Sequence, residues 1–243
     1  MDLSVVIPVF NEQDNIRPLV EEIVVALGGK ALFEIVYVND GSTDGTREGL
    51  LTLQQEYPVL RVLHHAQSCG QSTAIHTGVT AARADIIATL DGDGQNDPAD
   101  IPNLLAVFQQ AAKEQKLALV AGYRKRRQDS WIKLFSSRVA NAVRSRLLSD
   151  ATPDTGCGLK VFSRTVFLRL PYFDHMHRYL PALVLRDGGT VQSVEVNHRP
   201  RLQGISKYGI GNRLWVGIVD MIGVRWLQRR SHVPVVTEEP SDS

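Results

Sequence analysis

The chain has 243 residues, of which 43% are hydrophobic and 22% are charged, and its formal net charge is +1. A chain of this length buries one sizeable core or at most two small ones. Its two cysteines, Cys69 and Cys157, lie far apart and exclude a disulfide framework, so we expect small buried thiols in a reducing cytosol. The first apolar stretch is short and ends at Pro8, so we expect no signal peptide.

The N-terminal part of the chain alternates between strand and helix patterns. Residues 3–9 form an apolar run typical of a buried strand, and residues 14–27 carry apolar side chains at helical spacing. A second apolar run at 33–39 ends at Asp40, which is followed by residues that favour turns and helix starts. Asp40 therefore has two interpretations, because it either precedes a helix or belongs to a ligand site.

Strand and helix patterns continue to alternate further along the chain. We predict strands at 61–65, 86–90 and 117–122, with helices at 74–82 and 101–112. This order predicts an α/β fold built on a mostly parallel sheet with helices on both faces. We divide the chain into a globular domain at 1–211, an amphipathic helical tail at 212–232 and a disordered acidic end at 233–243.

The most informative segment is 86–98, where an apolar run ends in Asp91 and Asp93, with glycine between and after them. A strand directs such a pair outward at its carboxyl end, where open α/β sheets bind their ligands. Two carboxylates this close suit one hard cation, Mg²⁺ or Mn²⁺, whose coordination a bound diphosphate often completes. The alternative is a plain turn, since aspartate and glycine favour turns. A second acid at a strand end, Asp40, favours the site.

Four segments, in order, resemble the nucleotide-sugar glycosyltransferases of family 2, whose catalytic domain has the GT-A fold. They are the segments 6–12, 38–42, 70–78 and 91–95. Further matches at 122–124, 154–162 and 199–208 narrow the resemblance to the polyprenyl-phosphate branch, that of dolichol-phosphate mannose synthase. That branch has Asp-Ala-Asp-Leu-Gln where this chain has Asp-Gly-Asp-Gly-Gln. The resemblance implies that 1–211 is a catalytic domain of an inverting, metal-dependent sugar transferase.

The resemblance implies a donor site built around a diphosphate. Its metal ligands are Asp91, Asp93 and Gln95, and Asp40 holds the nucleoside. The other donor-site residues that the matched segments imply are Pro8, Phe10, Glu12, Gly92, Arg201 and Lys207. Arg201 and Lys207 clamp the diphosphate, unless they belong to a basic surface loop. Glu12 either lines the same pocket or caps the helix that follows it.

The acceptor phosphate is a second anion and needs cations of its own. The candidates are Arg124, which matches the Gly-x-Arg of the branch, and Lys133 with Ser137, which share one face of the following helix. A phosphate monoester is already ionised at neutral pH, so a strong general base is unnecessary. Asp154 is the candidate catalytic base if the reaction uses one, and otherwise an acid in a turn or at an N-cap.

Positive charge and exposed apolar character are concentrated in the second half of the chain. Residues 124–146 contain eight Lys or Arg and one acidic residue. A solvated helix face and nucleic-acid binding are alternatives, but a lipid phosphate or an anionic membrane surface explains this charge more economically. Residues 214–227 are apolar with tryptophans near both ends, yet too short and too charged to span a bilayer. We expect an interfacial helix, with a core or dimer helix as the alternative.

These features together predict an enzyme that moves a hexose, mannose or a similar sugar, from GDP-mannose or a UDP-hexose to a dolichyl or undecaprenyl phosphate. We expect it in the cytoplasm, peripherally on the inner face of the membrane and without a nucleic-acid partner. A processive polysaccharide synthase is disfavoured, because the glutamine of its Gln-x-x-Arg-Trp motif is missing before Arg225. A sugar-1-phosphate nucleotidyltransferase is also disfavoured, because this chain has no glycine-rich triphosphate loop after its first strand. The remaining rival is a non-catalytic module that binds a nucleotide sugar.

Overall fold

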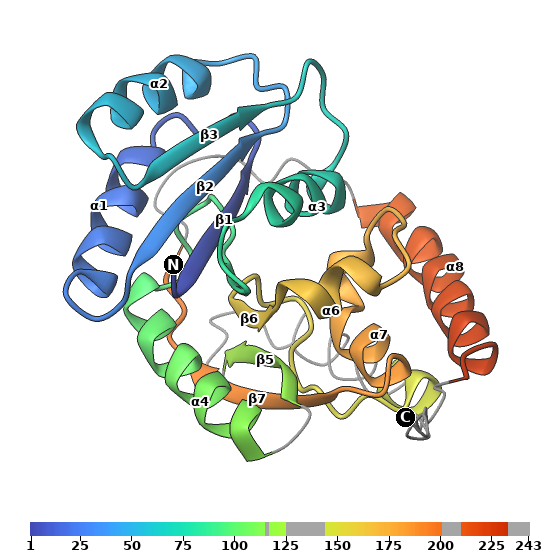
Figure 1. Cartoon of the computed structure of the whole chain (residues 1–243). Helices are drawn as coiled ribbons and strands as arrows, with labels where there is room; N and C mark the ends of the chain where they lie inside the picture. Colours follow the sequence, from blue (N-terminus) through green and yellow to red (C-terminus); the bar gives the residue numbers. More distant parts are fainter. Residues whose placement is uncertain (115–116, 125–143, 201–209, 233–243) are drawn as a thin grey trace, which may run out of the picture.

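The computed structural model describes residues 1–114, 117–124, 144–200 and 210–232, which form a mixed sheet flanked by helices (Figure 1). The strands lie in the order β3-β2-β1-β4-β6-β5-β7. Their bounds are β1 Leu3–Val9, β2 Phe33–Asn39, β3 Leu60–His64, β4 Ile86–Thr89, β5 Leu117–Arg124, β6 Lys160–Ser163 and β7 Thr190–Val196. Only β6 runs antiparallel to its neighbours in this described sheet, so the predicted α/β fold with a mostly parallel sheet is confirmed.

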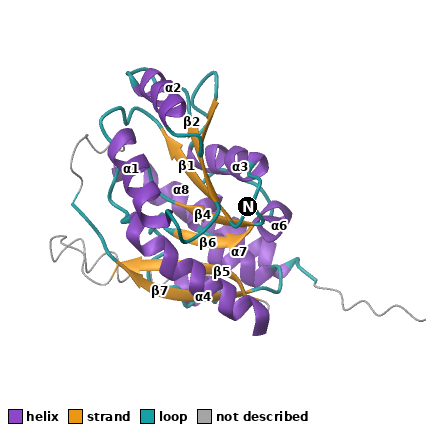
Figure 2. Cartoon of the chain, turned by 60° about the vertical axis from the view of Figure 1, so that its left-hand side comes forward, coloured by secondary structure: helices purple, strands orange, loops and turns teal. Residues whose placement is uncertain are grey.

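Helices cover both faces of the sheet, because side chains alternate along each strand. Val5 and Ile7 of β1 belong to one buried cluster, whereas Val6 between them belongs to the other. The first face carries α1 (Ile16–Leu27), α2 (Thr46–Glu56), the short η1 (Pro98–Asp100) and α4 (Ile101–Glu114); the second carries α3 (Gln71–Ala81), α6 (Arg164–Arg169), η2 (Met176–Arg178) and α7 (Leu180–Arg186). Figure 2 shows α1 and α4 in front of the sheet.

The predicted elements of the first half are present, with boundaries shifted by a few residues. The helix predicted at 14–27 begins at Ile16, and the one predicted at 74–82 begins three residues earlier, at Gln71. Sequence patterns did not predict the short elements between 160 and 196, which are β6, α6, α7 and β7. These elements contain few residues each, so their periodicity is weak and their form depends on the sheet against which they pack.

The tail helix α8 (Ile210–Arg229) has one face against the protein and one face in solvent. Val224 is fully buried on the inner face, where Tyr179 Oη donates to the Gly217 carbonyl at 3.0 Å and His175 Nδ1 lies 3.2 Å from Asp220 Oδ2. The outer face exposes Trp215, Val219, Ile222 and Trp226 by 70%, 55%, 62% and 58%. One face of α8 is thus packed on the protein, as the core-helix alternative expected, while an apolar face stays exposed, and its role as an interfacial helix stays a prediction.

Candidate active site

A cleft of about 710 Å³ opens where β1, β2 and β4 end. It brings together eight of the residues that the sequence predicted for the donor and metal sites: Pro8, Phe10, Glu12, Asp40, Asp91, Gly92, Asp93 and Gln95. These residues come from three strands that lie side by side in the sheet, as expected for the carboxyl edge of a parallel sheet. Lys133, Ser137, Arg201 and Lys207 lie outside the described residues.

Asp91 is held in place on several sides. Gln71 Nε2 donates to its Oδ1 at 2.8 Å, and its own backbone N–H donates to Asn96 Oδ1 at 3.1 Å. Gly158 packs so closely against it that a Cβ at this position would overlap the carboxylate. Burial and the charge of Asp93 raise the pKa of the Asp91 carboxyl above its usual range. A cation bound between the two aspartates would remove this repulsion.

Asp93 and Gln95 complete a set of oxygen donors on the same loop. Asp93 Oδ1 accepts a hydrogen bond from the Gln95 backbone N–H at 3.1 Å, which fixes the turn after Gly92. Gly92 has no room for a side chain, because a Cβ would overlap Val9. Two carboxylates and an amide oxygen lining one cleft are hard ligands of the kind that Mg²⁺ and Mn²⁺ prefer. The residues present therefore fit a divalent cation.

We expect Gly158→Ala to weaken Mn²⁺ binding about 10- to 100-fold, because displacing a group that orients a metal ligand has effects of this size. The added methyl group would push the Asp91 carboxylate out of its position. Paramagnetic resonance titration with Mn²⁺ measures the change. Gly223→Ala on α8 is the matched control, since a Cβ there meets no atom within 4 Å. Equal Mn²⁺ affinity in the two variants would contradict the proposed support of Asp91 by Gly158.

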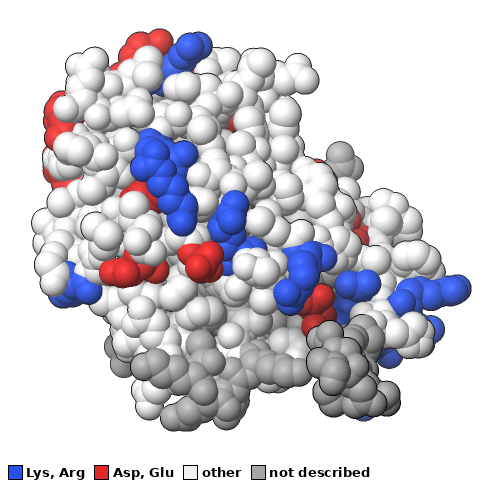
Figure 3. All heavy atoms as spheres, in the orientation of Figure 1, with Lys and Arg blue, Asp and Glu red and all other residues white. Residues whose placement is uncertain are grey.

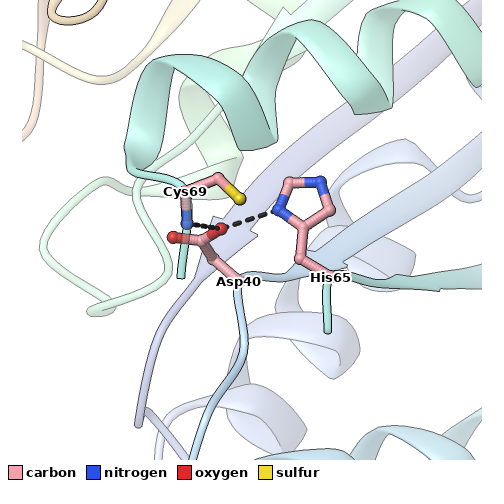
Figure 4. A group of neighbouring side chains, drawn as sticks. All are labelled: Asp40, His65 and Cys69. Carbon is pink, nitrogen blue, oxygen red and sulfur yellow. Dashed lines mark hydrogen bonds and ion pairs between the residues drawn. The ribbon is translucent and has the colours of Figure 1, made fainter. Parts of the chain in front are cut away.

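Asp40 lines the cleft, but its carboxylate is engaged with the loop before α3. Its oxygens accept from Ser68 Oγ at 2.7 Å and from the backbone N–H groups of Cys69 and Gly70, each at 2.9 Å. His65 Nδ1 lies 2.7 Å from Asp40 Oδ1 (Figure 4). Burial raises the pKa of Asp40, but these hydrogen bonds outweigh it and hold the pKa below its usual range. Asp40 therefore holds the loop at 68–70 in place as one wall of the cleft.

The cluster in Figure 4 also has donor atoms close enough for a metal ion, but hydrogen bonds already use them. His65 Nε2 lies 3.0 Å from Thr77 Oγ1, and Cys69 Sγ donates to the Gln67 carbonyl at 3.4 Å. Cys69 is exposed and Cys157 is buried, so the expectation of two buried thiols is wrong for Cys69. The backbone N–H of Cys69, and not its thiol, binds Asp40, so the side chain of Cys69 points toward the surface.

The N-cap of α1 is Asn15, without a side-chain capping hydrogen bond, so of its two interpretations Glu12 fulfils only the pocket-lining one. It lines the cleft, and its Oε2 accepts from Asn15 Nδ2 at 2.7 Å, at the start of α1. Its backbone N–H donates to Thr46 Oγ1 at 3.0 Å, which joins the loop after β1 to the start of α2. The residues around Glu12 therefore connect two helix starts to the mouth of the cleft.

Arg124 and Asp154, assigned separately to the acceptor and to the base, form one ion pair. Arg124 Nε and Nη2 donate to Asp154 Oδ2 and Oδ1 at 2.6 and 3.0 Å. Their side chains are only 16% and 6% exposed. Burial alone would lower the pKa of the guanidinium, but the hydrogen bonds to Asp154 raise it above its usual value. The guanidinium is thus charged, and the Asp154 carboxyl lies at ion-pair distance from it.

The polar residues of the cleft that sequence reasoning missed include Gln71, Lys160, His177 and Arg178. Gln71 and Lys160 lie in the segments 70–78 and 154–162, whose resemblance to the family could have pointed to both residues. His177 and Arg178 come from η2, which only the fold brings to the cleft. His177 Nδ1 lies 2.7 Å from Ser72 Oγ, and burial lowers the pKa of His177 well below its usual range, so its imidazole is neutral near pH 7.

The sequence matches the model of Glycosyl transferase family 2 over residues 4–170. It is 34% identical to the dodecaprenyl-phosphate galacturonate synthase of Rhizobium johnstonii, with 94% of this chain and 68% of that protein covered. It is also 34% identical to the undecaprenyl-phosphate 4-deoxy-4-formamido-L-arabinose transferase of Edwardsiella ictaluri, with 86% of this chain and 63% of that protein covered. The chain thus spans about two thirds of the length of these relatives.

The fold is similar to that of glucosyl-3-phosphoglycerate synthase from Mycobacterium tuberculosis, solved with Mg²⁺ and UDP. The TM-score is 0.67 at 19% sequence identity, over 96% of this chain and 80% of that one. The same enzyme with Mn²⁺, UDP-glucose and phosphoglyceric acid gives a TM-score of 0.65. This likeness supports the GT-A-like fold, and the sequence matches identify the family. The chain belongs to glycosyltransferase family 2, and its relatives include polyprenyl-phosphate sugar transferases.

Proposed function

We propose that the protein transfers a sugar from a nucleotide sugar to a polyprenyl phosphate, with inversion at the anomeric carbon and with Mg²⁺ or Mn²⁺ as cofactor. The observation that carries the proposal is the cleft in which Asp91, Asp93 and Gln95 face the residues at the ends of β1 and β2. The two named relatives support the acceptor class, because both names contain a polyprenyl phosphate.

In this proposal the donor lies along the carboxyl edge of the sheet. Pro8, Phe10 and the loop held by Asp40 enclose the nucleoside, and Asp91, Asp93 and Gln95 hold the cation. When bound, the cation neutralises the charge that develops on the leaving diphosphate. The protein keeps Asp91 in position through Gln71 and Gly158, so this charge is met by groups that are already in place.

The donor sugar is the least constrained part of the proposal. The relatives are named for galacturonate and for 4-deoxy-4-formamido-L-arabinose, so their names give no support for mannose in particular. We propose a UDP-linked sugar first and GDP-mannose second, since the structural neighbours were solved with UDP or UDP-glucose. The acceptor phosphate would approach from the side of Arg124 and Asp154, with Lys133 and Ser137 as further candidates and Arg201 and Lys207 closing over the donor.

The experiment that tests this function is a donor panel. Purified protein is incubated with UDP-galacturonate, UDP-glucose and GDP-mannose, each with undecaprenyl phosphate and Mn²⁺, and the lipid product is identified by mass spectrometry. A glycosylated polyprenyl phosphate in any reaction supports the proposal. Binding of UDP and Mn²⁺ without transfer or hydrolysis across the panel would favour the rival, a non-catalytic nucleotide-sugar binding module.

We also propose that α8 brings the enzyme to the inner face of an anionic membrane. Trp215, Val219, Ile222 and Trp226 are spaced to lie on one face of the helix, and that face is exposed. Figure 3 shows basic side chains near the right-hand edge, the side on which α8 lies in Figure 1. Arg225 and Arg229 belong to α8, and Arg230 follows it directly. In the part of the chain that the structure describes, no helix has the length and apolar character needed to cross a bilayer. We retain 212–232 as the tail segment, and 233–243 lies outside the described residues.

We expect the double variant Trp215→Ser, Trp226→Ser to bind phosphatidylglycerol vesicles at least about tenfold more weakly than the wild type, because burial of two indole groups is lost. Vesicle sedimentation measures the binding, and partial release at high salt is expected from screening of the arginines. The double variant Val25→Ser, Leu51→Ser is the matched control, since it removes exposed apolar side chains from α1 and α2. Equal vesicle binding by both double variants would contradict the assignment of α8.

A further inference from the structure

Lys160 is a buried cation in the floor of the cleft. It is the first residue of β6 and pairs with Thr89 of β4 and Ala121 of β5, so it lies between the strand that leads to Asp91 and the strand that ends at Arg124. The residue is only 4% exposed and lines the cleft. A lysine is rarely buried to this extent without a compensating anion, so its neighbours need to be accounted for.

The neighbours of Lys160 compensate its charge only in part. Its Nζ donates to the Cys157 carbonyl, and within the described ranges no carboxylate lies at ion-pair distance from it. Asp91 and Asp154 act on it through their charges, while burial lowers the pKa of the ammonium below its usual value. An ammonium has three N–H donors, and a carbonyl accepts one of them. The remaining donors are suited to an anion that enters the cleft.

The order of the strands indicates which anion this is. Along the edge of the sheet, the residues of the nucleoside wall follow β2 and β1, the proposed metal ligands follow β4, and Lys160 starts the next strand, β6. Lys160 therefore lies beyond the metal ligands, on the side away from the nucleoside. Arg124, on the following strand, is already bound to Asp154 through two hydrogen bonds. Among the described residues, Lys160 is thus a cation of the cleft floor with hydrogen-bonding capacity to spare, and Arg178 of η2 also lines the cleft.

We propose that Lys160 is a catalytic residue that binds the phosphate of the acceptor lipid and holds it against the donor sugar. This proposal rests on the function proposed above. In the reaction, an acceptor phosphate oxygen forms the new bond to the anomeric carbon, and the bond from that carbon to the diphosphate breaks with its electron pair going to the diphosphate. Lys160 donates no proton in this step, and the positive charge of its ammonium offsets the repulsion between the two phosphate groups.

The test measures binding of farnesyl phosphate and of UDP, each in the presence of Mn²⁺, by calorimetry. We expect Lys160→Met to weaken farnesyl phosphate binding about 10- to 100-fold, as for loss of a hydrogen bond to a charged group, with UDP binding changed less than about twofold. Lys160→Gln is measured beside it, because a glutamine retains an N–H donor for the Cys157 carbonyl but has no positive charge, and we expect the same loss of farnesyl phosphate affinity. Lys30→Met, an exposed lysine after α1, is the matched control.

Two outcomes would overturn the assignment of Lys160. Farnesyl phosphate binding that is unchanged in the folded variants would show that the ammonium serves only to hold the Cys157 carbonyl. A loss of UDP affinity as large as the loss of farnesyl phosphate affinity would place Lys160 at the donor diphosphate. Failure of the wild type itself to bind farnesyl phosphate would overturn the proposed function as well, so the two failures are distinguishable.

Discussion

Asp93→Asn is expected to lower kcat on the order of 1,000-fold while leaving the fold intact. The substitution removes one negative charge from the proposed metal site, and metal stabilisation of the leaving diphosphate contributes several kcal/mol to the transition state. The fold is retained because the asparagine Oδ1 can still accept the hydrogen bond from the Gln95 backbone N–H. Initial rates at saturating donor and Mn²⁺ measure the loss, and a thermal unfolding curve checks the fold.

Asp97→Asn is the matched control for Asp93→Asn. Asp97 lies on the same loop, but its Oδ1 accepts from the Ala99 backbone N–H at 3.0 Å as the N-cap of η1, which asparagine does equally well. The same Oδ1 also accepts from Arg199 Nη2 at 3.2 Å, and Arg199 keeps its ion pair with Glu22 in this variant. We expect this variant to keep near-normal kcat. Full activity of Asp93→Asn, or of the wild type in excess EDTA, would show that the reaction does not use a cation at this position.

Arg124→Met is expected to lower the free energy of unfolding by about 3 kcal/mol, since removing one partner of a buried ion pair leaves the other charge uncompensated. The charge left behind is Asp154, whose side chain is 6% exposed. Urea denaturation of the purified variant measures the change. The double variant Arg124→Met, Asp154→Asn is expected to recover part of the loss, because neither buried charge remains.

This double variant also separates structural support from substrate binding. If Arg124 contacts the acceptor phosphate as the sequence predicted, the double variant regains stability but keeps a raised KM for polyprenyl phosphate. If Arg124 serves only Asp154, the KM for the acceptor returns toward the wild-type value together with stability. If Arg124→Met lowers the free energy of unfolding by less than about 1 kcal/mol, the ion pair does not behave as a buried one, because exposed ion pairs contribute about this much.

The amino-acid sequence by itself determined most of the strands and helices of the first half, although not α2, and the edge of the sheet at which the cleft lies. Alternating apolar patterns and strand-end acids are local signals, because each needs only a few neighbouring residues. Asp40, Asp91 and Asp93 were found in this way, and parallel strands bring their ends to one edge of the sheet. The boundaries of α1 and α3 differ from the predictions because caps and loops, here around Gly70, decide where a helix starts.

Only the tertiary structure decided which charged groups meet. Arg124 and Asp154 are 30 residues apart, and the insertion of the antiparallel strand β6 between β4 and β5 brings Lys160 into the cleft. His177 and Arg178 reach the cleft from η2, a short turn without a sequence pattern of its own. Burial and pairing depend on contacts between distant segments, and the pKa and the role of an ionisable side chain depend on both. The amino-acid sequence shows which of these residues can be charged, but the distances between them follow only from the folded structure.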